Sequence, residues 1–363
     1  MKSVTFCFFL SLQCLLAAHA QDTVGATDIY PGPSDTASNI KTVSNTAGAY
    51  ASAMIGDGKA FGRNISGDQN MQGRALELRF GREFNPATLG VSFLSSPNAK
   101  IRADFVHYNE GHPENNHRDG FGVQLVYSNA FHRRITGEFG IGPYLSMNTT
   151  TIKGEEINDS ALGALVSLAL RIGLDQYSPG LHMRIGLNHV SMRNAHSSNA
   201  LLVGIGKTFS NPPSRAVTSS SAIPVWIGAS AGNSITNHGG PQSATGFSLK
   251  VKKHYQGPWA ASIAAVVEGD DKVRVDRRGV AIQGWFVQPL SDKWTVSAGL
   301  GPYIARNVRE AHGTRLHGLI TMQIDRSLTK TVKVFGSFNR VKTFMEENDR
   351  DLFLIGLTKQ FGS

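Results

Sequence analysis

The chain has 363 residues, of which 40% are hydrophobic and 17% charged, and its formal net charge at pH 7 is +9. That length suffices for two ordinary domains or one large barrel. The only cysteines, Cys7 and Cys14, lie within the first 20 residues. If that segment is removed, disulfides and thiol catalysis are excluded for the mature chain. The positive charge fits an anionic partner such as lipopolysaccharide phosphates, and equally a scattered basic surface.

Residues 1–20 have the pattern of a secretory signal peptide. Lys2 supplies the positive end, residues 6–18 form an apolar run, and Ala18-His19-Ala20 is a small-x-small cleavage site. The alternative, an N-terminal membrane anchor, is disfavoured because the run is short. Beyond it, no run approaches the roughly 20 apolar residues of a membrane helix. Residues 21–46 are expected to form a flexible periplasmic lead.

From about residue 47 onward, apolar side chains alternate with small or polar ones. Residues 74–84 place Leu76, Leu78 and Phe80 on one face, and Glu77 and Arg79 on the other. The same alternation recurs at 120–127, 135–145 and 181–191. Long polar connections are expected at 58–72, 109–120, 147–160 and 192–199, and short ones at 129–133 and 175–180. The connection 84–100 carries an insertion, with an extra β segment expected at 89–94. This pattern predicts an all-β, outer-membrane antiparallel β-barrel, with a soluble β-protein as the alternative.

The pattern occurs twice along the chain. GEFGIGPYL at 137–145 resembles SAGLGPYI at 297–304, and ALLVGIGKTF ending at Phe209 resembles LFLIGLTKQF ending at Phe361. Two tandem eight-stranded repeats are therefore predicted, at residues 47–209 and 223–363, joined by a Pro/Ser-rich linker at 210–222. A linker suits two separate barrels, whereas one sixteen-stranded barrel, the alternative, would need only a short turn.

A histidine and a serine share the apolar face of the predicted strand at 181–191. His189 and Ser191 are two residues apart, so they point the same way. In a membrane barrel that face contacts lipid, and a serine that attacks an ester needs a base within hydrogen-bond reach. The structural alternative is a pair of polar residues at the membrane interface.

A GxGPY strand, a penultimate strand ending in His-x-Ser and a last strand ending in an aromatic residue resemble the PagL family of outer-membrane lipid A 3-O-deacylases. The resemblance implies a serine esterase that removes an ester-linked acyl chain from lipid A, with His189 as general base and Ser191 as nucleophile. The family's glutamate falls near Asn199 or Ala200, and neither is acidic. Asn199 is expected to orient the histidine, and it stabilises an imidazolium less than a carboxylate does.

Other residues could contribute to such a site. Five acids in the predicted loops are alternative partners for the histidine: Glu114, Asp119, Glu155, Glu156 and Asp159. The string His196-Ser197-Ser198-Asn199-Ala200 also resembles the family motif, but its closeness to Phe209 predicts a loop. In the second repeat, Asn339 and Val341 are taken as the matching positions, and Lys342 and Thr343 do not restore the spacing. That repeat is predicted to be noncatalytic, with a structural or lipid-binding role.

No cofactor or metal is predicted. The segment 107–120 holds three histidines and three acids, but their spacings match no compact zinc pattern, and a solvated loop is favoured. Four basic residues of the second repeat are candidates for contacts with lipid phosphates: Lys272, Arg274, Arg277 and Arg278. We find no phosphate-binding glycine loop or nucleic-acid module. The expected place is the bacterial outer membrane, and the alternatives to an esterase are a noncatalytic barrel and a pore.

Overall fold

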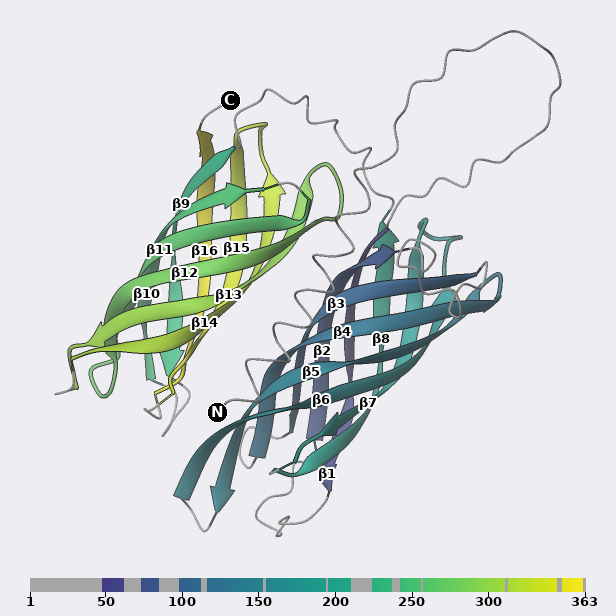
Figure 1. Ribbon diagram of the computed structural model, residues 1–363, viewed down its shortest axis with the longest axis horizontal. Helices are drawn as coiled ribbons and strands as arrows, with labels where there is room; N and C mark the ends of the chain where they lie inside the picture. Colours follow the sequence, from purple (N-terminus) through teal and green to yellow (C-terminus); the bar gives the residue numbers. More distant parts are fainter. Residues whose placement is uncertain are drawn as a thin grey trace, which may run out of the picture.

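The computed structural model describes residues 48–61, 73–84, 98–111, 116–152, 155–193, 195–209, 224–236, 242–255, 257–310, 313–344 and 348–361. Its described residues form two closed antiparallel barrels, which Figure 1 shows side by side. The predicted signal peptide, the lead 21–46, the β segment at 89–94 and the linker 210–222 lie outside the described residues.

Eight strands make each barrel. The first consists of β1 (Ala49–Phe61), β2 (Gly73–Phe84), β3 (Ala99–Gly111), β4 (Asn116–His132), β5 (Ile135–Ile152), β6 (Glu155–Gly173), β7 (Leu181–Ser191) and β8 (Ser197–Phe209). The second consists of β9 (Val225–Thr236), β10 (Gln242–His254), β11 (Trp259–Asp270), β12 (Asp276–Pro289), β13 (Trp294–Asn307), β14 (Thr314–Ser327), β15 (Val332–Lys342) and β16 (Arg350–Phe361).

Closure of the first sheet excludes the alternative of one sixteen-stranded barrel. β8 pairs with β1 over its whole length, from Ala49 opposite Phe209 to Phe61 opposite Ser197. β8 therefore has no free edge on which β9 could add. The second sheet closes in the same way, between β16 and β9. The prediction of two tandem eight-stranded barrels is confirmed, and the single wide barrel is wrong.

The strand faces follow the alternation of the sequence. On β2, Glu77 and Arg79 are buried in the lumen, whereas Leu76 points outward and is 40% exposed. On β7 the odd-numbered residues from Leu181 to Ser191 point outward. Side chains of a strand alternate between its two faces. A strand that alternates apolar with polar residues therefore has an apolar outer face and a polar inner face.

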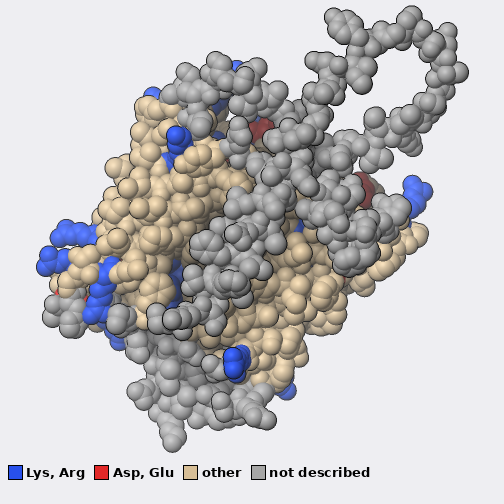
Figure 2. Space-filling view, viewed as in Figure 1, with Lys and Arg blue, Asp and Glu red and all other residues tan. Residues whose placement is uncertain are grey.

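The outer faces carry large apolar side chains in the open. Ile355 is 72%, Ile55 65% and Ile205 61% exposed. In Figure 2 the barrel walls seen from this side carry few charged side chains, and Lys and Arg lie mainly toward the barrel ends. The described residues contain no helix able to span a membrane.

The polar connections are shorter than the sequence predicts. β3 extends to Gly111 and β4 begins at Asn116, so most of the predicted loop 109–120 is strand. β5 and β6 likewise continue through most of the predicted loop 147–160. Polar side chains do not end a ladder, because antiparallel backbone pairing does not require an apolar face.

The lumen of the first barrel is filled by a closed ring of six charged residues. Arginines and carboxylates alternate around it in the order Glu77, Arg79, Asp104, Arg102, Glu138 and Arg184, with neighbouring N–O distances of 2.6 to 2.9 Å. Each of these side chains is at most 2% exposed. Three cations and three anions cancel, so each charge has two partners of opposite sign, which is the condition for burying such groups without a large penalty.

The two barrels share one register. Tyr144 on β5 and Tyr303 on β13 both point into the lumen, and their hydroxyls donate to the carbonyls of Tyr108 (2.7 Å) and Val266 (3.4 Å). If Tyr144 is aligned with Tyr303, the strand registers within each barrel fix which residue of the second barrel corresponds to each residue of the first. Both routes around the sheet give the same alignment, and it reproduces the predicted match of Phe209 with Phe361.

The barrels contact each other through their outer faces. Phe121 on β4 and Phe338 on β15 stack with ring centroids 6.2 Å apart. Asp119, on the same face of β4, pairs with Arg340 of β15, which also pairs with Asp351 of β16. Charged groups within this aromatic contact are buried together rather than left exposed on the wall.

Candidate functional site

His189 and Asn199 are brought together on the outer face of the first barrel. They are direct register partners on β7 and β8, and Nδ1 of His189 lies 2.9 Å from Oδ1 of Asn199. An amide oxygen only accepts hydrogen bonds, so this contact places the proton on Nδ1 and leaves Nε2 free to accept one. The ring of Phe61 stacks against the imidazole, with centroids 5.8 Å apart. A neutral imidazole in this contact has the tautomer that a general base needs.

Ser191 shares the outward face with His189. It is exposed, stands opposite Ala164 of β6, and is the last residue of β7. In the described part of the chain its hydroxyl forms no hydrogen bond with His189. The candidate nucleophile and base are therefore neighbours on one strand face without a preformed contact.

The second histidine string is not a loop, contrary to the expectation. Ser197 to Ala200 belong to β8, and Ser198 points into the lumen, where it is fully buried. Its hydroxyl contacts Glu110 and accepts a 2.6 Å hydrogen bond from Nη1 of Arg118. A hydroxyl held inside the lumen cannot reach a substrate in the membrane.

Of the alternative acidic partners, Asp119 does not support His189. Asp119 is committed to Arg340 of the second barrel, so it does not orient the histidine. Glu114 and the side chains of Glu155, Glu156 and Asp159 lie outside the described residues.

The histidine and acid residues of segment 107–120 do not share one face. His107 and Asp119 point outward, with Nδ1 3.5 Å from Oδ1, whereas Glu110 is in the lumen bound to Arg118 (2.9 Å). His112 and Glu114 lie outside the described residues. The described residues contain no group of three potential metal ligands.

The counterpart of the site in the second barrel differs from the predicted one. The shared register aligns His189 with Arg340, Ser191 with Lys342, and Asn199 with Asp351. Asn339 and Val341, predicted to match, point into the lumen instead. The cause is a slip of one residue in counting along the sequence, which exchanges the two faces of a strand. Arg340 and Lys342 still supply no histidine and no hydroxyl.

One of the four predicted lipid-phosphate contacts is wrong. Arg277 is fully buried in the second lumen, where its guanidinium binds Glu268 at 2.7 and 2.8 Å. Glu110 and Arg118 form the equivalent pair in the first barrel. Lys272 is exposed and pairs with Asp270.

Sequence reasoning did not predict that charged residues from several strands interact with one another in the lumen. The alternation placed Glu77 and Arg79 on the inner face, but their partners Asp104, Glu138 and Arg184 come from other strands. The available signal was the number of ionisable residues at inward positions. In a narrow barrel such residues must meet at the axis.

Comparisons with known proteins give similarity to solved structures alone. No family model matches the chain, and no curated protein matches it. Among solved structures, Neisserial surface protein A is 14% identical over 44% of this chain and 97% of its own, with a TM-score of 0.33. Ail of Yersinia pestis is 10% identical over 45% of this chain and 99% of its own, with a TM-score of 0.32. The translocator domain of the autotransporter NalP of Neisseria meningitidis is 11% identical over 99% of this chain and 98% of its own, with a TM-score of 0.19.

The class of protein rests on the closed sheets themselves: two eight-stranded antiparallel β-barrels in one chain. Identities and TM-scores this low carry no argument about activity. The resemblance to the PagL family accordingly stays a prediction from the sequence motifs.

Proposed function

We propose that the chain is a bacterial outer-membrane protein whose two barrels span the membrane as filled cylinders and act through their outer surfaces, without hydrolysing a substrate. The observation that carries this proposal is the inverted distribution of side chains. Large aliphatic residues such as Ile55, Ile205 and Ile355 are exposed on the walls, while Arg79 and Arg102 are buried inside. Water would penalise such a surface, whereas hydrocarbon favours it, and closed barrels satisfy every backbone group within a bilayer.

Filled lumens favour a scaffold over a pore. In the first barrel, the charged ring and the layer around Tyr108 and Tyr144 occupy the axis. In the second, Trp285 and the Glu268–Arg277 pair do so. An eight-stranded barrel has an interior just wide enough for its own side chains. We expect no stepwise single-channel conductance in a planar bilayer. Discrete conductance steps from the wild type would overturn the filled-lumen proposal.

Membrane insertion is tested by fractionation. The full chain expressed in a Gram-negative host should remain in the outer-membrane pellet after alkaline carbonate extraction, and it should migrate differently on gels before and after heating. Recovery in the soluble periplasmic fraction would contradict the proposal. A double variant that places charges on the wall, Ile205→Asp with Ile55→Asp, should reduce insertion, since charged residues at mid-membrane cost several kcal/mol.

A second candidate function is favoured by one specific contact. The hydrogen bond of His189 to Asn199, with Ser191 on the same face, provides a base, an orienting amide and a nucleophile on a lipid-facing wall. Acyl chains in the membrane could reach this face laterally. The candidate reaction is hydrolysis of an ester-linked acyl chain of lipid A. Nε2 of His189 takes the serine proton, the serine oxygen attacks the ester carbonyl, and the lipid A hydroxyl leaves with that proton. Water, deprotonated by the same histidine, then cleaves the acyl-serine ester and releases the acyl chain as a carboxylic acid.

The esterase candidate is tested on lipid A itself. Mass spectra of lipid A from cells with the wild type should show loss of one ester-linked acyl chain, and Ser191→Ala and His189→Ala should each abolish that loss. Ser198→Ala is a matched control, because that serine is enclosed in the lumen. Identical lipid A in cells with and without the wild-type protein would contradict the esterase candidate and favour the noncatalytic function.

A further inference from the structure

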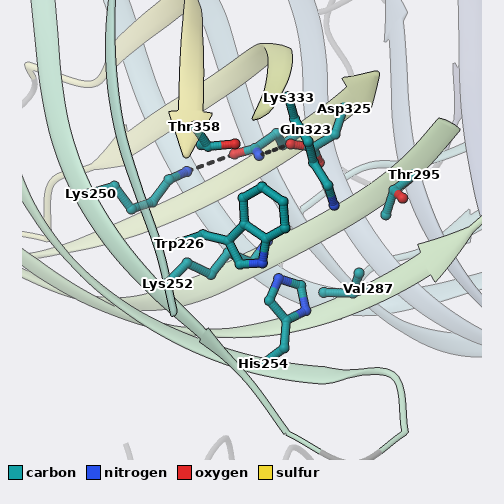
Figure 3. A pocket seen from close by; sticks show the side chains of 10 residues that line it. All are labelled: Trp226, Lys250, Lys252, His254, Val287, Thr295, Gln323, Asp325, Lys333 and Thr358. Carbon is teal, nitrogen blue, oxygen red and sulfur yellow. Dashed lines mark hydrogen bonds between the residues drawn. The ribbon is translucent and has the colours of Figure 1, made fainter. Parts of the chain in front are cut away.

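We propose that the lumen of the second barrel holds a binding site for a small, soluble phosphate-bearing anion, at the end where the chain enters and leaves the barrel. The site goes beyond the proposed function, since neither the scaffold nor the esterase uses this lumen. It is a pocket whose space between atoms, part of it open to solvent, is about 380 Å³. Its central residues are Lys250, Lys252 and Lys333, together with Trp226 and Asp325. Figure 3 shows their side chains turned toward one another around the indole of Trp226.

The cavity lies at the level of the charged ring of the first barrel, and the shared register allows a position-by-position comparison. The three carboxylates of that ring, Glu77, Asp104 and Glu138, correspond to Ser248, Ser262 and Ser297. All three anions are thus replaced by serines. The second barrel therefore cannot rebuild the self-neutralised ring.

One of the three ring cations keeps its charge in the second barrel, because Ala260 and Phe335 stand at the positions of Arg102 and Arg184. Lys250 stands at the position of Arg79, and Lys252 at that of Gly81. Lys333, at the position of His182, adds a third ammonium. Of the residues that line the cavity, only Asp325 carries a negative charge. The three lysines and this aspartate leave two positive charges without a counterpart, whereas the ring of the first barrel is neutral.

Among the described residues, the three lysines have no carboxylate partners. Nζ of Lys250 donates to Oε1 of Gln323 at 2.6 Å, and Nζ of Lys252 to the hydroxyl of Ser297 at 3.4 Å. In the described part of the chain none of the three ammonium groups forms an ion pair. Lys250 and Lys252 are 8% and 6% exposed, so water does not replace the missing anions fully. Buried charge without a partner is costly, and a bound anion removes that cost.

Aromatic rings hold the cations in place. Nζ of Lys252 is 3.8 Å and that of Lys250 4.5 Å from the ring centroid of Trp285, and Nζ of Lys333 is 4.4 Å from that of Trp226. A π face stabilises an ammonium only partly, and it leaves the remaining N–H donors available. His254 and Thr358 border the same cavity and can contribute further polar contacts. Several donors around one small cavity suit the oxygens of a phosphate group.

The closed sheet determines by which route an anion can reach the pocket. The sheet is closed around the cavity, so a lipid headgroup cannot enter between strands. Trp226 and Thr358 lie near the start of β9 and the end of β16, and the turn after His254 is short. In outer-membrane barrels, chain ends and short turns face the periplasm. Access is therefore through the periplasmic mouth, which favours a soluble phosphate compound.

The proposal is tested with the full chain folded in detergent micelles and titrated with inorganic phosphate by calorimetry. We expect saturable binding, weakened at least tenfold by Lys252→Met. The matched control is Lys253→Met, because Lys253 is the next residue on β10 and points outward. It should bind phosphate as the wild type does. Ser297→Glu, which restores the carboxylate found at Glu138, should also abolish binding.

Three results would overturn the site. They are absence of phosphate binding by the wild type, equal binding by Lys252→Met, and equal loss in both lysine variants. A parallel titration with dihexanoyl phosphatidic acid distinguishes the source. Binding of this lipid without binding of inorganic phosphate would overturn the assignment to a soluble anion. Heat-dependent gel mobility verifies that each variant is folded.

Discussion

Arg340 of the second barrel occupies the place that His189 has in the first, and its guanidinium binds Asp119 across the barrel contact. The same outward position at the end of the penultimate strand thus carries a histidine–amide pair in one barrel and an ion-paired arginine in the other. Asp351, the counterpart of Asn199, completes the arginine's environment. Duplication gave two equivalent wall positions, and the second of them joins the barrels.

Breaking this ion pair should weaken the contact between the barrels. Asp119→Asn leaves Arg340 with Asp351 alone, and loss of one partner of a desolvated pair costs about 2–5 kcal/mol. Cross-linking can measure the effect in a chain lacking residues 1–20, which has no native cysteine, with Phe121→Cys and Phe338→Cys introduced. A short bismaleimide should join the two cysteines efficiently, and Asp119→Asn should lower the yield severalfold. A cysteine pair at Ile55 and Ile355 serves as the control for random collision. An unchanged cross-linking yield in Asp119→Asn would show that the ion pair between Asp119 and Arg340 does not hold the barrels together.

The charged ring should be a major source of stability for the first barrel. Glu77→Gln removes one anion from between Arg79 and Arg184 and leaves a net positive charge in a buried site, which we expect to cost about 3–5 kcal/mol. Urea unfolding in lipid vesicles measures this difference. Asp57→Asn, on an exposed position of β1, should change stability by less than about 0.5 kcal/mol. Equal small effects of both substitutions would show that the ring contributes little.

Asn199→Asp separates a catalytic from an interfacial role of His189. A carboxylate at Oδ1 would stabilise the imidazolium that forms when the histidine takes the serine proton, so ester hydrolysis should rise about tenfold or more. The gain should vanish in the double variant with Ser191→Ala. If hydrolysis is absent in the wild type and also in Asn199→Asp, the esterase candidate fails, and the outer-membrane scaffold is unaffected.

The glycines of the GxGPY motif are predicted to be irreplaceable for steric reasons. A Cβ atom on Gly301 would collide with the carbonyl oxygen of Ile282, and one on Gly142 with that of Val123. The neighbouring backbone cannot move without breaking the ladder, so Gly301→Ala should destabilise the second barrel by about 1–3 kcal/mol. Gly284, whose Cβ would meet nothing within 4 Å, is the matched control. Comparable urea midpoints for Gly301→Ala and Gly284→Ala would contradict the steric argument.

Acid should loosen the connection between β11 and β12. Burial acts to raise the pKa of the Asp271 carboxyl, but N–H groups of Val275, Arg274 and Val273 and the hydroxyl of Thr236 donate to it and hold its pKa below the usual 3.8. A lowered pKa in the folded state means that the carboxylate adds stability above about pH 4, which is lost as the pH falls below that value.

Asp271→Asn measures that contribution. At pH 7 the variant should be less stable than the wild type by about 1–3 kcal/mol, because hydrogen bonds to a charged acceptor are lost. The difference should shrink as the pH approaches 3 in a series of urea titrations. A difference independent of pH would show that the carboxylate charge does not matter there.

The strand pattern could be predicted because the inner and outer faces of a barrel wall have different surroundings. Outward residues such as Leu76 must be apolar and inward ones such as Glu77 small or polar, which produces a clear alternation. Residues 148–151 of β5 are all polar, so the alternation disappears at that end of the strand. The structure nevertheless extends β5 to Ile152, into the segment predicted as a loop.

The candidate site could be predicted only in part, for a reason of register. The outward direction of His189 and its closeness to Asn199 follow from local alternation within one hairpin. Its counterpart in the second repeat required counting across connections of different length, and a slip of one residue pointed to Asn339 instead of Arg340. The contacts of Arg184 with two other strands depend on closure of the sheet, which no local pattern contains.

Because β8 returns to β1, each half of the chain seals its own edges and needs nothing from the other half to complete its sheet. Because the two sheets close separately, the two barrels have no lumen in common. The lining of one barrel can therefore carry serines at positions where that of the other carries carboxylates. In a single sixteen-stranded barrel, the inward side chains of both halves would have lined the same lumen.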